Sequence, residues 1–301
     1  MRWLFSTDWH LCDRRPGTRV DDDFFETQTA KVKEIFTIAD NEQVDLILHG
    51  GDFFDHPLMD LHLINSTIQL LKLSPVPIRI IFGSHDVLGY NIDTRTRTAI
   101  GTLLKAGVVE LVKTEAFGIN ATTKHTVELY KGIEQQIILT HNMLLPKEVI
   151  FEHILCDTIA PVLPEGSIVL CGHYHQPFNH FNEEHQIRFI NPGCLIRTDI
   201  SEATHAPMVL IGEDNQFLKK VKLASAKLGS TIFDTIAHQE VKQRENAFNT
   251  FVASLKIAKS TTEQYDLETL IMKVAKEQKI DATVRNEALT RIRIQATSLP
   301  A

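Results

Sequence analysis

The first part of the chain, to about residue 110, alternates between short apolar runs and segments of helical periodicity, and this alternation limits the fold more than any other feature. The runs RWLFS, VDLILHG and PVPIRIIFG, at residues 2–6, 44–50 and 75–83, are predicted to be buried strands. Between them, residues 25–39 and 60–73 repeat apolar side chains at helical spacing. Strand, helix, strand, helix, strand is typical of parallel βαβ units.

From about Val108 the pattern changes to short strands with fewer helices between them. The sequence GEDNQ separates two apolar runs and indicates a hairpin turn. We predict a second, more antiparallel sheet here, and therefore an α/β (α+β) fold of two packed β-sheets flanked by helices. The expected strands are residues 108–112, 126–130, 136–140, 167–171, 186–190 and 207–223.

After about Ser225 the pattern changes again. TIFDTI is compatible with one more strand, and residues 241–255, 267–275 and 284–292 carry apolar stripes typical of amphipathic helices. We predict a main domain over residues 1–225 and a small, mainly helical C-terminal module over residues 226–301.

Charge and cysteine content restrict the partners and the compartment. The net charge of -7 argues against a broad basic surface for nucleic acid, although a local basic strip or bound metal ions would still permit contact. An acidic residue by position 8 and the lack of about 18 consecutive apolar residues argue against a signal peptide and a membrane span. We expect a cytoplasmic protein, because its cysteines are scattered and favour a reducing compartment: Cys12, Cys156, Cys171 and Cys194.

Five polar clusters each follow a predicted strand. Ligand sites in α/β sheets lie beyond the carboxyl ends of the strands, so the clusters are expected to meet. Carboxylates and imidazoles bind Mn, Fe, Zn and related divalent ions. Taken singly, each cluster also fits an ordinary polar turn. The clusters are Asp8 and His10 in STDWH, Asp52 in HGGDFFD, Ser84, His85 and Asp86 in FGSHD, His141 in ILTHN, and His173 and His175 in LCGHYH.

The order DWH, GGD, GSHD, TH and GHYH resembles the signature of the calcineurin-like metallophosphoesterases over about residues 1–215. Within that superfamily the chain is most similar to the SbcD-type DNA-repair nucleases. The additional segments that carry this likeness are FSTDWHL, ILHGGDFFDHP, PVPIRIIFGSHD, CGHYHQP and NPGCLIRTDISE. The resemblance implies a pair of sheets with two metal ions at the strand ends.

The resemblance also implies a role for each motif residue. Asp8, His10 and His175 would hold one ion, and Asp52 would bridge to a second. The second ion would be held by Ser84, His141 and His173. Such an ion pair clamps a phosphate and lowers the pKa of a water. His85 would contact the phosphate and act as general acid, or stabilise charge on the leaving group, and Asp86 would orient it.

The chain departs from the family at Ser84, where the family has asparagine. A serine hydroxyl is shorter than the asparagine amide and is a weaker oxygen donor. Ser84 would then coordinate through water, or the second ion would bind only with substrate. The remaining alternative is a turn residue in a degraded site.

We therefore expect a DNA exo/endonuclease with two divalent ions, Mn(II) in the first place and Mg, Fe or Zn as alternatives. It would work in DNA repair, recombination or end processing with an SbcC-like coiled-coil ATPase docked on the C-terminal module, in a bacterial or bacteriophage-infected cell. A homodimer is compatible with the resemblance. Two alternatives stay open: a phosphatase or phosphodiesterase for small molecules or nucleotides, and a non-catalytic scaffold with a weakened site.

Two segments beside the clusters are candidates for substrate contact. The first is the loop that contains Arg14, Arg15 and Arg19, for which a solvated loop is an equal alternative because three aspartates adjoin it. The second follows GSHD, where loop residues beside a site often serve binding. It contains Tyr90, Asn91, Arg95 and Arg97.

Overall fold

The computed structural model describes residues 1–112, 116–122, 125–131, 137–234, 236, 243, 248, 267–277 and 280–297. Contacts divide the chain into two compact units, Met1–Phe233 and Asp234–Ala301. The sequence places the boundary near residue 225, and the roles given to the two parts remain predictions. Among the described helices, none has the length and apolar character needed to cross a membrane.

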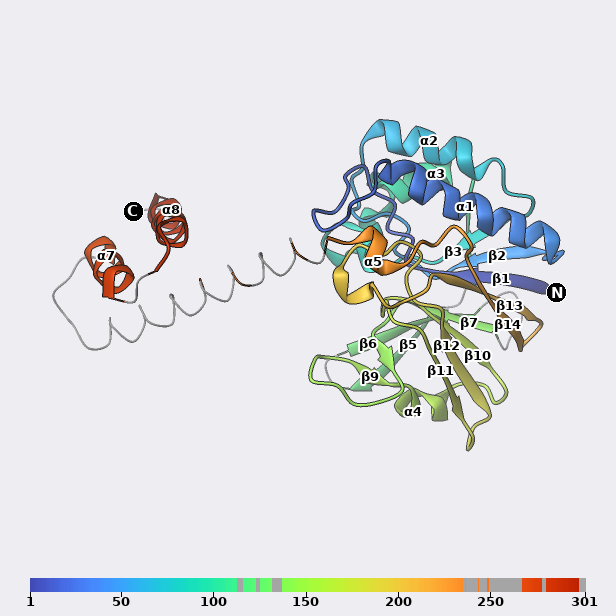
Figure 1. Cartoon of the computed structure of the whole chain (residues 1–301). Helices are drawn as coiled ribbons and strands as arrows, with labels where there is room; N and C mark the ends of the chain where they lie inside the picture. The colour runs from blue at the N-terminus through green and yellow to red at the C-terminus, as the bar shows by residue number, and fades with distance from the viewer. Residues whose placement is uncertain are drawn as a thin grey trace. The chain divides into compact units, whose positions relative to one another are not determined.

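The first unit contains two six-stranded sheets (Figure 1). In the first sheet the order is β14-β13-β1-β2-β3-β4, and β1, β2, β3 and β4 run parallel. This confirms the predicted βαβ arrangement. The strands are β1 Arg2–Ser6, β2 Leu46–His49, β3 Ile78–Ile80, β4 Glu110–Leu111, β13 Met208–Glu213 and β14 Gln216–Lys222.

The hairpin of β13 and β14 joins the first sheet, and so does β4, whereas the sequence grouped all three strands with the second sheet. β13 pairs antiparallel with β1, with Leu4 opposite Ile211. The predicted hairpin turn is confirmed, since β13 and β14 pair through Glu213 and Gln216. The chain thus returns to its own first strand, a long-range pairing that hydrophobic periodicity does not reveal.

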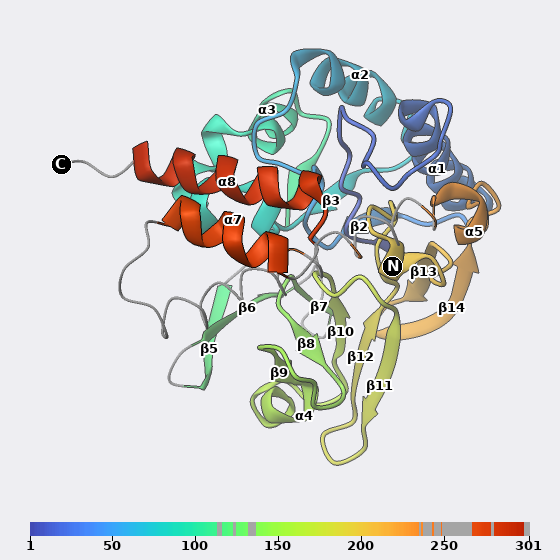
Figure 2. The ribbon, with the colours of Figure 1, turned by 60° about the vertical axis from the view of Figure 1, so that its left-hand side comes forward.

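The second sheet has the order β11-β12-β10-β7-β6-β5 (Figure 2). It is mixed: β10 pairs parallel with β7 and β12, and the outer pairs are antiparallel. Its strands are β5 Ala116–Thr122, β6 His125–Lys131, β7 Ile137–Thr140, β10 Ile168–Cys171, β11 Phe178–Asn182 and β12 Ile187–Asn191. A small parallel pair, β8 Leu144–Leu145 and β9 Ile154–Leu155, follows β7.

Alternation along the strands builds a layered core. In β1, Trp3 and Phe5 belong to the apolar cluster shared by the two sheets, while Leu4 belongs to the cluster under the helices. In β7, Ile137 faces the shared cluster and Ile138 faces the outer side of the second sheet. Successive side chains of a strand point to opposite faces, so both sheets are covered on both sides.

Helices cover the outer face of the first sheet (Figure 1). Asp23 begins α1 by accepting a hydrogen bond from Glu26 N, and Asp60 begins α2 in the same way through His62 N. Both helices place apolar stripes on the sheet. The helices of the first unit are α1 Phe24–Asn41, α2 Leu61–Leu71, α3 Ala99–Lys105, α4 Cys156–Ile159 and α5 Gly229–Ile232.

The C-terminal predictions have mixed outcomes. The described residues of TIFDTI do not form a strand: α5 ends at Ile232, and Phe233 pairs with Arg19 in a single bridge. The helices α7 Leu267–Glu277 and α8 Ala282–Thr297 confirm two of the predicted helices. The helix expected at residues 241–255 lies almost entirely outside the described residues.

Candidate metal centre

The polar clusters lie on loops that leave the carboxyl ends of five strands. β1, β2 and β3 lead to Asp8, Asp52 and Ser84 in the first sheet. β7 and β10 lead to His141 and His173 in the second. Backbone hydrogen bonds tie neighbouring loops together, for example from Asp8 N to Gly51 O at 3.1 Å. The two sheets therefore bring all five clusters to one place.

The first group of ligand atoms comes from Asp8, His10 and His175, which the sequence assigned to one ion. Their ligand atoms lie within 4.8 Å of one another. His10 Nε2 is 3.0 Å from His175 Nε2, and Asp8 Oδ1 is 3.8 Å and 3.7 Å from these two nitrogens. Two imidazole nitrogens and a carboxylate thus face one point.

The second group comes from Asp52, His141 and His173, also within 4.8 Å of one another. His141 Nε2 lies 3.0 Å from Asp52 Oδ2. This nitrogen is buried and has no partner of hydrogen-bond geometry. Asp52 Oδ2 also lies 3.8 Å from His10 Nε2, so this carboxylate faces both groups, as a bridging ligand must.

Backbone strain is concentrated at these same residues. Positive φ angles occur at seven described residues other than glycine, and four of the seven are expected ligands. Left-handed backbone is unfavourable for such residues and persists where the surrounding structure enforces it, often at functional sites. The four are Asp8 at 51°, His10 at 43°, Asp52 at 53° and His173 at 74°.

Glycines allow the loops to approach each other. A Cβ on Gly83 would lie 2.1 Å from Asp52 Oδ1, and one on Gly51 would lie 2.6 Å from His141 Nδ1. Gly51 also has a φ of 97°, which disfavours any side chain. The space around the Asp52 carboxylate therefore depends on these two glycines.

The donor set fits divalent ions. Three histidines turn Nε2 inward, and each has a protein oxygen near the outer Nδ1. His141 Nδ1 donates to Gly50 O at 2.7 Å, and His175 Nδ1 donates to the Glu202 carboxylate. His10 Nδ1 lies 3.2 Å from Asp55 Oδ1, without full hydrogen-bond geometry. Metal-binding histidines commonly have such an acceptor, which fixes the tautomer with Nε2 free to coordinate.

The electrostatics of the second group also favour a cation. Burial by itself disfavours the charged imidazole of His141, but the Asp52 carboxylate outweighs burial and raises the pKa of His141 to about 10. Burial would raise the pKa of Asp52, yet the positive charges of His141 and His10 lower it. Burial lowers the pKa of His173 to about 4. The Asp52 carboxylate therefore favours a positive charge at this position.

His85 lies at the edge of both groups and is partly exposed. Its backbone N–H donates to Asp52 Oδ1 at 2.8 Å, and its Nδ1 lies 2.5 Å from Asp55 O. With Nδ1 occupied by this carbonyl, Nε2 is available to a substrate. Its ring nitrogen is also within 4.8 Å of ligand atoms of His10 and Asp52.

Ser84 and Asp86 flank His85 with different contacts. Ser84 Oγ donates to Asp52 Oδ2 at 3.4 Å, so its hydroxyl reaches the carboxylate that faces both groups. Asp86 does not orient the His85 ring as expected. Its oxygens accept from the backbone N–H of Phe53 at 3.0 Å and Gly83 at 2.9 Å. Asp86 instead fixes the two loops, and burial together with Asp52 raises its pKa to about 7.

Sequence reasoning missed two residues, Asp55 and Glu202. Asp55 contacts His10 through its carboxylate and His85 through its carbonyl oxygen. Its presence in GGDFFD, three residues after Asp52, was the only available signal. Glu202 ends a short 3-10 turn, Ile200–Glu202, and is buried. The Asp199 and Glu202 spacing of a capping box signals that turn but not a contact with His175.

The segment NPGCLIRTDISE, residues 191–202, forms hydrogen bonds with the expected ligands of the first group. Cys194 N donates to His175 O at 3.2 Å, and Leu195 N donates to Asp8 O at 3.0 Å. Asn191 Nδ2 donates to Tyr174 O at 2.7 Å. Glu202 adds the contact to the His175 ring. These contacts hold Asp8 and His175 in position.

Replacing Glu202 by glutamine is expected to lower the affinity for the first ion by about ten- to a hundredfold. This is the usual effect of losing the hydrogen-bond partner of a metal-binding histidine. One carboxylate oxygen of Glu202 now accepts from the His175 ring, and the other accepts from the backbone N–H groups of Thr198 and Asp199. A glutamine amide has only one oxygen and cannot accept all of these hydrogen bonds. Calorimetric titration with Mn(II) measures the change.

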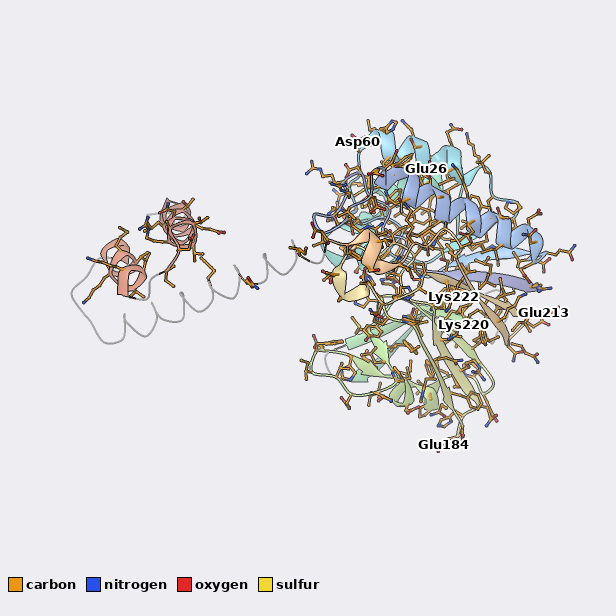
Figure 3. The ribbon with its side chains drawn as sticks, in the orientation of Figure 1. Glu26, Asp60, Glu184, Glu213, Lys220 and Lys222 are labelled. Atoms are coloured by element: carbon orange, nitrogen blue, oxygen red, sulfur yellow. The ribbon has the colours of Figure 1, made fainter. Side chains whose placement is uncertain are left out.

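Glu184→Gln is the matched control, since Glu184 is exposed at the tip of the β11–β12 hairpin (Figure 3). It should leave both affinities unchanged. An equal loss of affinity for both ions in Glu202→Gln, or a loss of fold in a thermal melt, would contradict a specific role at His175.

The arginines expected to contact substrate have different environments. Arg19 is buried and pairs through two nitrogens with Asp21, so it does not face solvent. Arg15 donates to Asp21 O at 2.5 Å, and Arg95 donates to Ile92 O at 3.2 Å. Arg14, Asn91 and Arg97 are exposed, and the side chain of Tyr90 lies outside the described residues.

Comparison with known proteins identifies related chains. A family model described as "Calcineurin-like phosphoesterase superfamily domain" matches residues 1–213. The DNA double-strand break repair protein Mre11 of Methanosarcina mazei is 25% identical over 194 residues. That alignment covers 58% of this chain and 30% of the length of that protein.

Two solved structures resemble the chain loosely. Yfce, a phosphoesterase from E. coli, has a TM-score of 0.37 and 12% identity, covering 74% of this chain and 99% of that one. A conserved predicted phosphoesterase from Streptococcus pneumoniae has a TM-score of 0.35 and 15% identity, covering 73% and 88%.

Proposed function

Because the chain belongs to the calcineurin-like phosphoesterase superfamily, whose members use a dinuclear metal site, we propose that it is a two-metal phosphodiesterase that cuts DNA. The observation that carries the proposal is the pair of ligand groups that Asp52 faces together, with the partly exposed His85 at their edge. Asp8, His10 and His175 would hold one ion, and His141 and His173 the other, with Ser84 beside it.

Each residue has a defined task in the reaction. When bound, the two ions would polarise the phosphate oxygens and lower the pKa of the attacking water. Asp55 O holds Nδ1 of His85, which leaves Nε2 to protonate the leaving oxygen. Asp86 and the glycine-rich loops keep Asp52 and His85 at a fixed separation.

DNA is proposed as substrate on two grounds. The first is similarity to Mre11, which is a DNA double-strand break repair protein. The second is the SbcD-like segment NPGCLIRTDISE, which contacts the ligands of the first ion. We propose Mn(II) as the ion, with Mg, Fe or Zn as alternatives, since a mixed set of carboxylate and imidazole ligands accepts divalent ions of this kind.

An SbcC-like coiled-coil ATPase is the proposed partner of the second unit. Helices α7 and α8 pack through Ile271, Val274, Ala275 and Ala288. This mutual packing accounts for these four side chains, and the proposed partnership rests on the resemblance to SbcD-type proteins. Co-purification of such an ATPase with the full chain, and its loss when the C-terminal unit is removed, would test this partnership.

Linear DNA incubated with Mn(II) tests the proposed function directly. Release of nucleotides that stops when the metal is chelated is the expected result. Hydrolysis of only a chromogenic phosphodiester would indicate an enzyme for small substrates. Lack of turnover on every substrate and with every ion would indicate a non-catalytic scaffold.

Ser84→Asn is expected to bind the second ion more tightly, with equal or higher nuclease activity. The asparagine amide oxygen extends further than the serine hydroxyl, which now reaches only to the Asp52 carboxylate. Calorimetry with Mn(II) gives the affinity of each ion. If Ser84→Asn leaves the stoichiometry and the affinity unchanged, Ser84 does not limit binding of the second ion. Ser84→Ala is the control that lacks a side-chain oxygen at this position.

A further inference from the structure

An apolar loop tip follows the segment that carries His141. The loop joins β8 to β9, and β8 begins three residues after His141. Ile150 at the tip is fully exposed, and Phe151 is 46% exposed. Val149 beside them is also exposed. Consecutive exposed apolar side chains are costly in water and commonly mark a contact surface.

The tip is held in a defined shape by His153. This side chain is nearly buried, with 8% exposure. Its Nδ1 contacts Phe151 O at 2.8 Å, and its Nε2 lies 3.1 Å from the Glu148 carboxylate. Ile154 N also donates to Met143 O at 2.9 Å and closes the base of the loop. The apolar tip is therefore presented by a braced loop.

The Phe151 ring faces the middle residue of the GHYH motif. The ring centroids of Phe151 and Tyr174 are 6.5 Å apart, with 36° between the planes. Tyr174 lies between the expected ligands His173 and His175, and Asn191 fixes its carbonyl oxygen. Both rings are partly exposed. Two aromatic rings thus lie together beside the backbone that carries His173 and His175.

We propose that Phe151 and Tyr174 bind the nucleobase next to the phosphodiester group that is cut. This inference rests on the proposed function and specifies its substrate class. A sugar joins base and phosphate, so a nucleotide held by its phosphate brings its base beside the centre. Every base offers a π-face, and stacking on aromatic rings is tolerant of sequence. A phosphate ester without a planar group would gain nothing from these rings.

A matched pair of dinucleotides isolates this contact. One is the thymidine dinucleotide, and the other carries an abasic sugar in place of one thymidine, with each position tested. The wild-type protein with Mn(II) should cleave the full dinucleotide with about tenfold higher kcat/KM, the order expected for one stacked base. Phe151→Ala should remove most of that preference, chiefly through KM, and change cleavage of the abasic substrate little.

Two further variants complete the test. Phe181→Ala is the matched control, since Phe181 is 39% exposed on β11, and it should preserve the preference. Phe151→Trp retains a planar ring and should also preserve it. An equal loss on both dinucleotides with Phe151→Ala, or a wild-type protein that cleaves both equally, would overturn the base site while phosphodiesterase activity stands. Failure to cleave either dinucleotide or linear DNA would overturn the proposed nuclease itself.

Discussion

Asp52→Ala is expected to abolish binding of both ions and to lower turnover by at least about a thousandfold. Loss of one preorganised electrostatic group in an active site already costs about 10²–10³-fold. Asp52 faces both ligand groups through Oδ2 and holds His85 N through Oδ1. Calorimetry with Mn(II) should show no binding in the micromolar range, and phosphodiester hydrolysis should fall to background.

Asp40→Ala is the control for this change, because Asp40 is an exposed carboxylate on α1. It should bind two ions as the wild type does. A thermal melt of the metal-free proteins separates a lost centre from a lost fold. Retention of one ion at full affinity by Asp52→Ala would mean that this carboxylate belongs to a single site.

His85→Ala is expected to lower kcat by about 10²–10⁴-fold while both ions stay bound, since this is the usual contribution of a general acid. The effect should be largest with a nucleoside leaving group, which needs a proton. It should be smaller with 4-nitrophenolate, which leaves without one. Steady-state rates on the two kinds of ester, with metal content measured in parallel, provide the test.

His56→Ala is the neighbouring control, because the His56 ring lies 6.4 Å from the His85 ring. The His56 side chain is 69% exposed. This variant should keep turnover and metal. If His85→Ala loses an ion, His85 is a ligand, an arrangement that its distance from His10 and Asp52 permits. If its rate falls equally with both leaving groups, His85 does not donate the proton.

Much of the fold and of the centre follows from local sequence patterns. Parallel strands place their carboxyl ends together, so polar residues after β1, β2 and β3 had to lie near one another. The same rule applies to His141 and His173 after β7 and β10. The order of the motifs and their resemblance to a known signature led us to expect that the clusters of both sheets meet, and the structure adds the contact of Asp52 Oδ2 with His141 Nε2.

The features that escaped prediction depend on contacts between distant segments. Glu202 meets His175 only because the segment after β12 folds back across the first group. The Asp86 carboxylate accepts a hydrogen bond from the backbone N–H of Phe53 in another loop and does not hold the His85 ring. β13 joins β1 across most of the unit. Left-handed backbone at Asp8 and Asp52 likewise requires the assembled loops and has no sequence signal of its own.

The number of manganese ions bound per chain, measured together with phosphodiester turnover, tests the two-ion centre most directly. Equilibrium dialysis of the wild-type protein should show two ions per chain, with the second binding more weakly because Ser84 lies beside it. Turnover should appear as the second ion is taken up. A single ion at saturation, or turnover that persists after the metal is removed, would contradict the account.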